Sequence, residues 1–186
     1  MIQTKRLCLT PLDPEGDLER YLRWLRDSRV TRFLENRFFP TDMPSLRAYV
    51  HEKNSSSSAL LFGIHVLWRG GWIGNIKLEP IDYIHRRGEI GIMIGSVDHW
   101  GKGYATEAIG ALTRYAFRDL GLSRLTAGCY AQNIGSRKAF EKNGFQQEGL
   151  YRHHIWCDGR FHDEILFGLL YEDWAFLNDP NFDPSR

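Results

Sequence analysis

Residues 88–117 read GEIGIMIGSVDHWGKGYATEAIGALTRYAF, and this stretch organises the rest of the chain. It opens with an apolar run interrupted by glycines, which predicts a β-strand over residues 89–94. After a polar loop, apolar residues recur at helical spacing and predict a helix over residues 104–119. A strand that enters a helix through a glycine-rich turn presents unpaired backbone N–H groups at the positive end of that helix. The stretch therefore predicts an anion site, most often one for phosphate.

The composition narrows the classes of protein to which the chain can belong. Its 186 residues carry a formal net charge of +1, which argues against a protein that binds nucleic acid through bulk electrostatics. No apolar run approaches the roughly 18 residues that a membrane helix needs, and the start MIQTKRLCLTPL is too polar for a signal peptide. The three cysteines, Cys8, Cys129 and Cys157, form no CxxC pair. We therefore expect a cytoplasmic protein with no membrane and no nucleic-acid partner.

The order of the predicted elements indicates the fold class. We expect a strand, two or three helices, three strands, a helix, a strand, a helix and a final pair of strands. This order makes an α/β (α+β) domain around one mixed sheet. We expect hairpin turns at residues 69–71 and 158–159. A single domain is placed over residues 1–177, and a C-terminal tail rich in proline, asparagine and aspartate over residues 178–186.

Two motifs together point to one protein family. The glycine-rich loop has neither the Lys-Ser/Thr pair of a Walker A loop nor the spacing of a dinucleotide-binding turn. A second motif, NIGSRKAFEKNGF, occupies residues 133–145. With WGKGYATEA, it resembles the Gcn5-related N-acetyltransferase (GNAT) superfamily, and most of all its Rim-type branch of ribosomal-protein N-terminal acetyltransferases. The loop of that superfamily reads R/Q-x-x-G-x-G/A, and here Trp100 replaces the arginine or glutamine.

This resemblance covers nearly the whole chain and implies a fold and an activity. The implied fold is a central mixed, mostly antiparallel sheet of about seven strands, flanked by about four helices and splayed at the strand that binds the cofactor. The implied activity is that of an N-acetyltransferase, an acyltransferase with acetyl-coenzyme A (acetyl-CoA) as its co-substrate. The implied acceptor is a primary amine that attacks the donor directly: a protein N-terminal amine, an amino sugar or another small amine.

The resemblance also assigns the donor to particular residues. Backbone N–H groups of the loop would hold the pyrophosphate, and free backbone groups near the end of the strand at 89–94 would pair with the pantetheine arm and polarise the acetyl carbonyl. We expect Gly91 to form a bulge that splays this strand from its neighbour. The expected donor-binding residues are Met93, Ile94, Trp100, Gly101, Lys102, Gly103, Tyr104, Ala105, Thr106 and Asn133.

The transfer needs two proton movements, and the sequence offers candidates for each. Many members of the superfamily protonate the leaving thiolate with a tyrosine on the helix after the fifth strand, but this chain has Phe140 there. Rim-type relatives suggest Ser136 as the substitute, with Asn133 as a partner of the cofactor or of a water. For the base we take Glu89 first and His154 second. An amine that deprotonates in solvent, without a dedicated base, is the third alternative.

Other interpretations stay open at this point. Because Phe140 has no hydroxyl, a catalytically silent module that binds or senses acyl-CoA is the alternative function. The seven histidines show no metal-ligand spacing, so we expect no metal site. Aromatic residues make up 13% of the chain. They could form a homodimer contact or line an acceptor cleft, or they could pack in the core.

Overall fold

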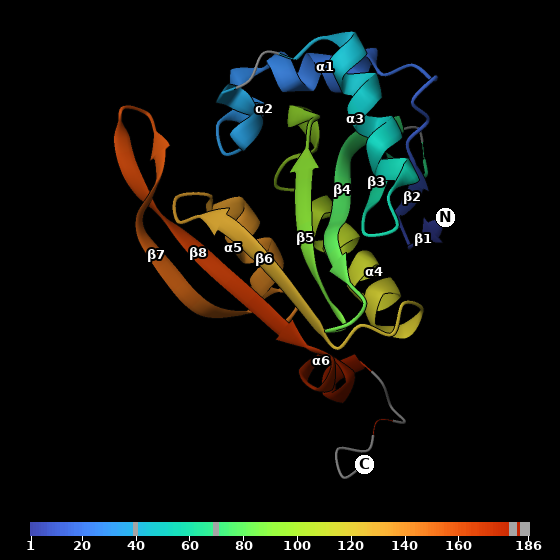
Figure 1. The fold of residues 1–186 in the computed structure, drawn as a ribbon, viewed down its shortest axis with the longest axis vertical. Helices are drawn as coiled ribbons and strands as arrows, with labels where there is room; N and C mark the ends of the chain where they lie inside the picture. Colours follow the sequence, from blue (N-terminus) through green and yellow to red (C-terminus); the bar gives the residue numbers. More distant parts are fainter. Residues whose placement is uncertain (39–40, 69–70, 179–181, 183–186) are drawn as a thin grey trace.

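The structure, a computed structural model, describes residues 1–38, 41–68, 71–178 and 182. One eight-stranded sheet runs through this part of the chain, in the order β1-β2-β3-β4-β5-β6-β8-β7 (Figure 1). Neighbouring strands are antiparallel except β5 and β6, which are parallel, so the mixed, mostly antiparallel sheet is confirmed. The strands are β1 (Ile2–Gln3), β2 (Leu7–Pro11), β3 (Leu60–Val66), β4 (Gly71–Asp82), β5 (Arg87–Ile94), β6 (Arg124–Tyr130), β7 (Gln146–Cys157) and β8 (Arg160–Leu170).

Helices cover both faces of the sheet. On one face, Ala108, Ile109 and Leu112 of α4 are completely buried. On the opposite face, α1 and α3 pack around Leu61. Successive side chains of a strand point to opposite faces, so Leu61 and its neighbour Phe62 belong to different core clusters. The helices are α1 (Glu19–Arg26), α2 (Ser28–Thr31), α3 (Met43–Ser55), α4 (Tyr104–Arg118), α5 (Ile134–Glu141) and α6 (Tyr171–Asn178), with 3-10 turns η1 (Glu35–Phe38) and η2 (Val97–His99).

Most of the elements expected from the sequence form close to their expected bounds. The helix predicted over residues 104–119 is α4, which begins at Tyr104 as expected. The short strand β1 and the helix α6 were not foreseen. Parts of the predicted turn at 69–71 and of the predicted tail, residues 69–70, 179–181 and 183–186, lie outside the described residues. Within the described ranges, no helix has both the length and the apolar character needed to cross a membrane.

The separation of β5 from β6 is the feature that positions the site. Their parallel pairing joins only residues 87–89 of β5 to residues 124–126 of β6. On its other side, β5 stays paired with β4 as far as Ile94. Beyond residue 89, the two parallel strands move apart (Figure 1). The splay expected at the cofactor strand is therefore confirmed.

The bulge expected at Gly91 is wrong. Gly91 pairs directly with Lys77 in an uninterrupted part of the β4–β5 ladder. The irregularity lies in β4 between Leu78 and Ile81, where two residues oppose one residue of β5. Pro80 lies in this bulge and has no N–H to donate, so the ladder is interrupted there. Gly91 leaves the β4–β5 pairing intact, and the opening arises on the other edge of β5.

Candidate active site

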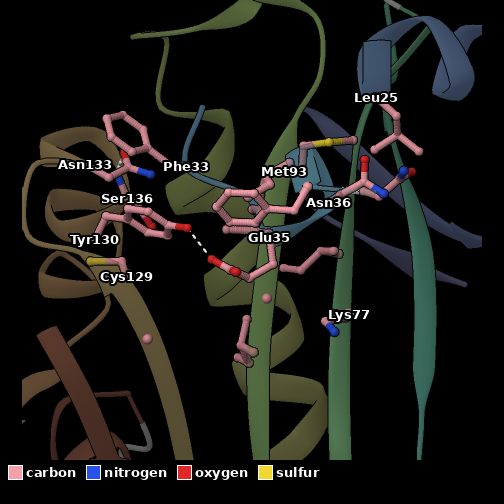
Figure 2. Close-up of a pocket in the computed structure, with 18 of the residues that line it drawn as sticks. Leu25, Phe33, Glu35, Asn36, Lys77, Met93, Cys129, Tyr130, Asn133 and Ser136 are labelled. Carbon is pink, nitrogen blue, oxygen red and sulfur yellow. Dashed lines mark hydrogen bonds between the residues drawn. The ribbon is translucent and has the colours of Figure 1, made fainter. Parts of the chain in front are cut away.

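A cavity of about 1010 Å³ lies where β5 and β6 separate. Its walls come from α1, from the segment around η1, from β4, β5 and β6, from the β7–β8 hairpin and from the start of α5 (Figure 2). Most of the lining is apolar or aromatic. Polar groups also line it, among them the carboxylates of Glu35 and Glu164, the hydroxyl of Tyr130 and the ring of His154. A mostly apolar cavity with a few convergent polar groups is typical of a site for a small substrate.

The glycine-rich loop forms an open turn at the start of α4. Gly101 and Gly103 have φ angles of +71° and +78°, a backbone conformation that glycine adopts without strain. Gly103 is the N-cap of α4, and a Cβ added at Gly101 would meet no atom within 4 Å. Residues 101–103 are exposed. The unpaired N–H groups at the start of a 15-residue helix are therefore accessible to an anionic ligand.

Trp100 links this loop to the end of β5. Its indole Nε1 donates a hydrogen bond of 2.7 Å to the carbonyl of Ile94, while the ring stays 42% exposed. The Ile94 carbonyl therefore already has a donor and is not a free backbone group, contrary to the sequence-based expectation. Met93, the other expected pantetheine partner, pairs with Asn75 of β4 and lines the cavity. The structure thus brings the loop and the β5 end together through Trp100.

Asn133 and Ser136 lie together at the start of α5 and both line the cavity (Figure 2). Asn133 is the N-cap, and its Oδ1 accepts a hydrogen bond of 3.1 Å from the Ser136 backbone N–H. Phe140, one helical turn further on, is 1% exposed; in the core it stacks on Phe167 and meets Phe145 edge to face. The helix cap therefore orients the Asn133 side chain, while Phe140 packs against the core.

Glu89, the first candidate for the base, is exposed on β5 and does not line the cavity. The carboxylate that does reach it from β8 is Glu164, whose Oε2 lies 3.4 Å from Nε2 of His154. Burial raises the pKa of Glu164; a charged His154 opposes this effect, and Glu89 and Glu35 add to it. A raised pKa makes Glu164 a stronger proton acceptor than an ordinary glutamate once it is ionised. His154, the second candidate for the base, therefore lies beside Glu164.

Gly128 of β6 makes room for this carboxylate. A Cβ at residue 128 would lie 2.6 Å from Oε1 of Glu164, closer than real Cβ atoms approach. Gly128 pairs with Leu166, two residues beyond Glu164 on the neighbouring strand. The absence of a side chain at residue 128 therefore leaves the space that the Glu164 carboxylate occupies.

A segment that we call the strap, residues 33–38, crosses from the helical side of the cavity to β6 and β7. Arg37 donates hydrogen bonds to the Tyr130 hydroxyl at 2.5 Å and to the Trp156 carbonyl at 2.8 Å. The Tyr130 hydroxyl in turn donates to Glu35 (Figure 2). Burial raises the pKa of Tyr130 to about 12; the bond to Glu35 adds to this, and Arg37 opposes it. Tyr130 therefore stays protonated near neutral pH and keeps the strap attached to β6.

Glu35, Tyr130 and Glu164 line the cavity but were not predicted from the sequence as site residues. Glu164 carried one signal, since it is an acidic residue that directly precedes the apolar run ILFGLL within a predicted strand. Glu35 and Tyr130 carried none, because their contact spans 95 positions of the chain. Only the folded sheet brings these three groups to one cavity.

Comparisons with known proteins agree with this geometry. Residues 6–146 match the family model for the acetyltransferase (GNAT) domain. The chain is 33% identical over 177 residues to an uncharacterised N-acetyltransferase, p20, of Bacillus licheniformis, covering 94% of this chain and 98% of that protein.

Two solved structures share the fold. The spermidine N-acetyltransferase of Vibrio cholerae, in complex with CoA and spermine, superposes with a TM-score of 0.83 at 23% identity, over 92% of this chain and 99% of that chain. The ribosomal L7/L12 α-N-protein acetyltransferase RimL, in complex with coenzyme A, gives 0.80 at 17% identity, over 90% and 95%. The family match and the relative from Bacillus licheniformis together show that the chain belongs to the GNAT family of N-acetyltransferases, enzymes whose acyl donor is acetyl-CoA.

Proposed function

We propose that this chain transfers an acetyl group from acetyl-CoA to a primary amine by direct attack in the cavity between β5 and β6. The observation that carries the proposal is the separation of β5 from β6 beyond residue 89. It opens a cavity with two carboxylates beside a strand whose far end is bonded, through Trp100, to an anion-binding loop. An acyl transfer needs donor binding and proton acceptance, and the groups for both lie next to β5.

The donor half rests on the loop and on β5. Backbone N–H groups of residues 101–106 hold the pyrophosphate, and the open space at Gly101 admits close approach of phosphate oxygens. The edge of β5 that faces away from β4 accommodates the pantetheine arm along residues 90–94. Acetyl-CoA supplies a thioester whose carbonyl carbon takes the amine and whose thiolate leaves. Asn133 and Ser136 lie at the cavity wall, where the Ser136 hydroxyl passes a proton to that thiolate while it takes up another from a water molecule.

The acceptor half rests on Glu164. An alkylammonium ion must lose a proton before its nitrogen can attack, and Glu164 takes this proton directly or through one water. His154, 3.4 Å away, holds the carboxylate in position. Glu89 acts only through its charge, which raises the pKa of Glu164. This assignment transfers the role first given to Glu89 to a carboxylate that lines the cavity.

The strap restricts which amines reach Glu164. Its bonds from Arg37 and Glu35 to Tyr130 and Trp156 narrow the acceptor side of the cavity. Glu35 adds a second carboxylate there, which favours a cationic amine over a neutral one. We therefore favour an acceptor that is slender near its amine, such as a peptide N-terminus or a linear amine, over an amino sugar.

A silent acyl-CoA-binding module is the second candidate, and the buried Phe140 is the observation in its favour. One assay separates the two: thiol release from acetyl-CoA is followed with peptides, linear amines and amino sugars as acceptors, beside calorimetric binding of CoA. The enzyme is expected to release thiol only with an accepted amine, and the Glu164→Gln variant to lose this release while CoA binding persists. Tight CoA binding without thiol release on any amine would favour the module.

A further inference from the structure

The donor loop is bonded to a residue almost a hundred positions earlier in the chain. Arg6, in the turn between β1 and β2, donates from Nη1 to the carbonyl of Lys102 at 3.1 Å. Its guanidinium carbon lies 4.5 Å from the centroid of the Tyr104 ring. Arg6 therefore contacts the loop at two residues that flank Gly103, the N-cap of α4.

Arg6 is itself held by a carboxylate at the start of α4. Its Nε lies 2.5 Å from Oε2 of Glu107, and its backbone N–H donates to Oε1 at 2.9 Å. The hydroxyl of Thr4 donates to the same Oε1 at 2.6 Å. Burial alone would raise the pKa of Glu107, but the hydrogen bonds from Thr4 and Arg6 and the charge of Arg6 lower it. Glu107 is therefore ionised, and its charge is matched by Arg6.

The bond to Lys102 sets the direction of a donor on the loop. The Lys102 carbonyl and the Gly103 N–H belong to one planar trans peptide, so they point in opposite directions. With the carbonyl directed at Arg6, the Gly103 N–H must face away from Arg6. Lys102 lies between two glycines at φ +71° and +78°. Because glycine allows many backbone conformations, the local sequence restricts the orientation of this peptide only weakly.

Glu107 supplies the second reason why Arg6 matters. A carboxylate in the first turn of a helix lies close to the N-terminal N–H groups that would bind an anion. Without its cationic partner, that carboxylate would repel a pyrophosphate. Position 100, which in the superfamily loop carries an arginine or a glutamine, here carries Trp100 and brings no cation.

We propose that Arg6, held by Glu107 and Thr4, is the positioning residue of the donor loop. It directs the Gly103 N–H toward the pyrophosphate of the donor and neutralises Glu107. This inference rests on the proposed function, because it takes acetyl-CoA as the ligand of the loop.

The test compares two thioesters in the full-length protein. Acetyl-pantetheine lacks the pyrophosphate, so the role of Arg6 should be visible only with acetyl-CoA. For Arg6→Met, we expect KM for acetyl-CoA and Kd for CoA to rise about tenfold, as for one lost hydrogen bond to a charged group. We expect kcat at saturating acetyl-CoA, and kcat/KM for acetyl-pantetheine, to stay within about twofold of the wild type. Adding Glu107→Gln to Arg6→Met should recover part of the lost affinity, because the repelling charge is removed.

Two further variants guard against a merely structural effect. Arg124, at the start of β6, forms an ion pair with Glu148 of β7, and Arg124→Met breaks this pair. This variant controls for general destabilisation and should leave KM for acetyl-CoA unchanged. Arg6→Lys keeps the charge but has one nitrogen, which cannot reach both Glu107 and the Lys102 carbonyl in the same way, and should raise KM at least threefold.

Unchanged KM and Kd in both Arg6 variants would overturn the inference, as would an equal loss with both thioesters. If the wild type acetylates no amine with either donor, the proposed function fails instead, and CoA binding by the same variants still tests the role of Arg6.

Discussion

A single added methyl group at Gly128 offers the sharpest test of the Glu164 assignment. In the Gly128→Ala variant, the new Cβ would lie 2.6 Å from Oε1 of Glu164, whereas ordinary contact begins at 3.4 Å. The carboxylate must therefore retreat by about 0.8 Å. Misplacement of a catalytic group by about 1 Å can cost on the order of 100-fold in rate, so we expect kcat/KM for the amine to fall by that order.

The fold should not suffer from this substitution. The atom that must move is the end of a flexible side chain, and Gly128 has no positive φ. Replacing a strand glycine by alanine removes backbone freedom from the unfolded chain, which is worth about 0.4–1 kcal/mol in favour of folding. We therefore expect an unchanged or slightly raised Tm together with the loss of activity, measured by thermal unfolding and by thiol release.

A double-mutant cycle distinguishes displacement of the base from simple obstruction. In a Glu164→Ala background no carboxylate remains to be displaced, so Gly128→Ala should cause little further loss. A Gly128→Ala enzyme with wild-type kcat/KM would refute the reasoning that Glu164 must occupy its observed place. An undiminished additional loss in the Glu164→Ala background would show instead that the methyl group blocks the cavity.

Four further predictions concern the loop, the proton transfers and the core. Gly103→Asp should weaken CoA binding in calorimetry, because it forces aspartate to φ +78° and places its Cβ 3.6 Å from Nη2 of Arg6, where the new carboxylate competes with the Lys102 carbonyl for Arg6. Ser136→Ala should lower kcat by about tenfold or more while Kd for CoA stays within about twofold. An unchanged kcat would mean that solvent, and not Ser136, protonates the leaving thiolate. In wild type, kcat should fall as the pH drops through the raised pKa of Glu164, above the usual range for glutamate, and Glu164→Gln should remove this limb of the profile. Gly95→Ala should lower Tm markedly, since a Cβ there would lie 2.0 Å from a ring atom of Trp24; an unchanged Tm would contradict the packing.

Local features of the chain were predictable to different degrees. The helix α4 was placed from its start because apolar spacing and the glycines before Tyr104 mark its N-terminus in the sequence. The role of Gly91 was misjudged, since a glycine within a strand pattern does not reveal which neighbour it faces. The bulge lies instead at Pro80, where a missing N–H gives a definite reason for interruption.

The site divides in the same way. Asn133 and Ser136 were identified from a contiguous motif, and the structure places both at the cavity wall. Glu89 was chosen as base because it begins the cofactor strand, but its side chain is exposed and outside the cavity lining. Which carboxylate reaches the cavity depends on the face that each strand presents and on the register between β6 and β8.

By itself, the sequence identified the family through two contiguous motifs, and it predicted the glycine-rich loop and the start of α4, because these features depend on residues that are close together in the chain. Two glycines at positive φ and the helix start that follows them need only a short stretch of chain. Only the tertiary structure decided which side chains come together around the cavity. Glu164 meets His154 across a hairpin, Tyr130 meets Glu35 across 95 positions, and Arg6 meets Lys102 across 96. Such contacts are set by strand order and register, which local residue preferences do not encode.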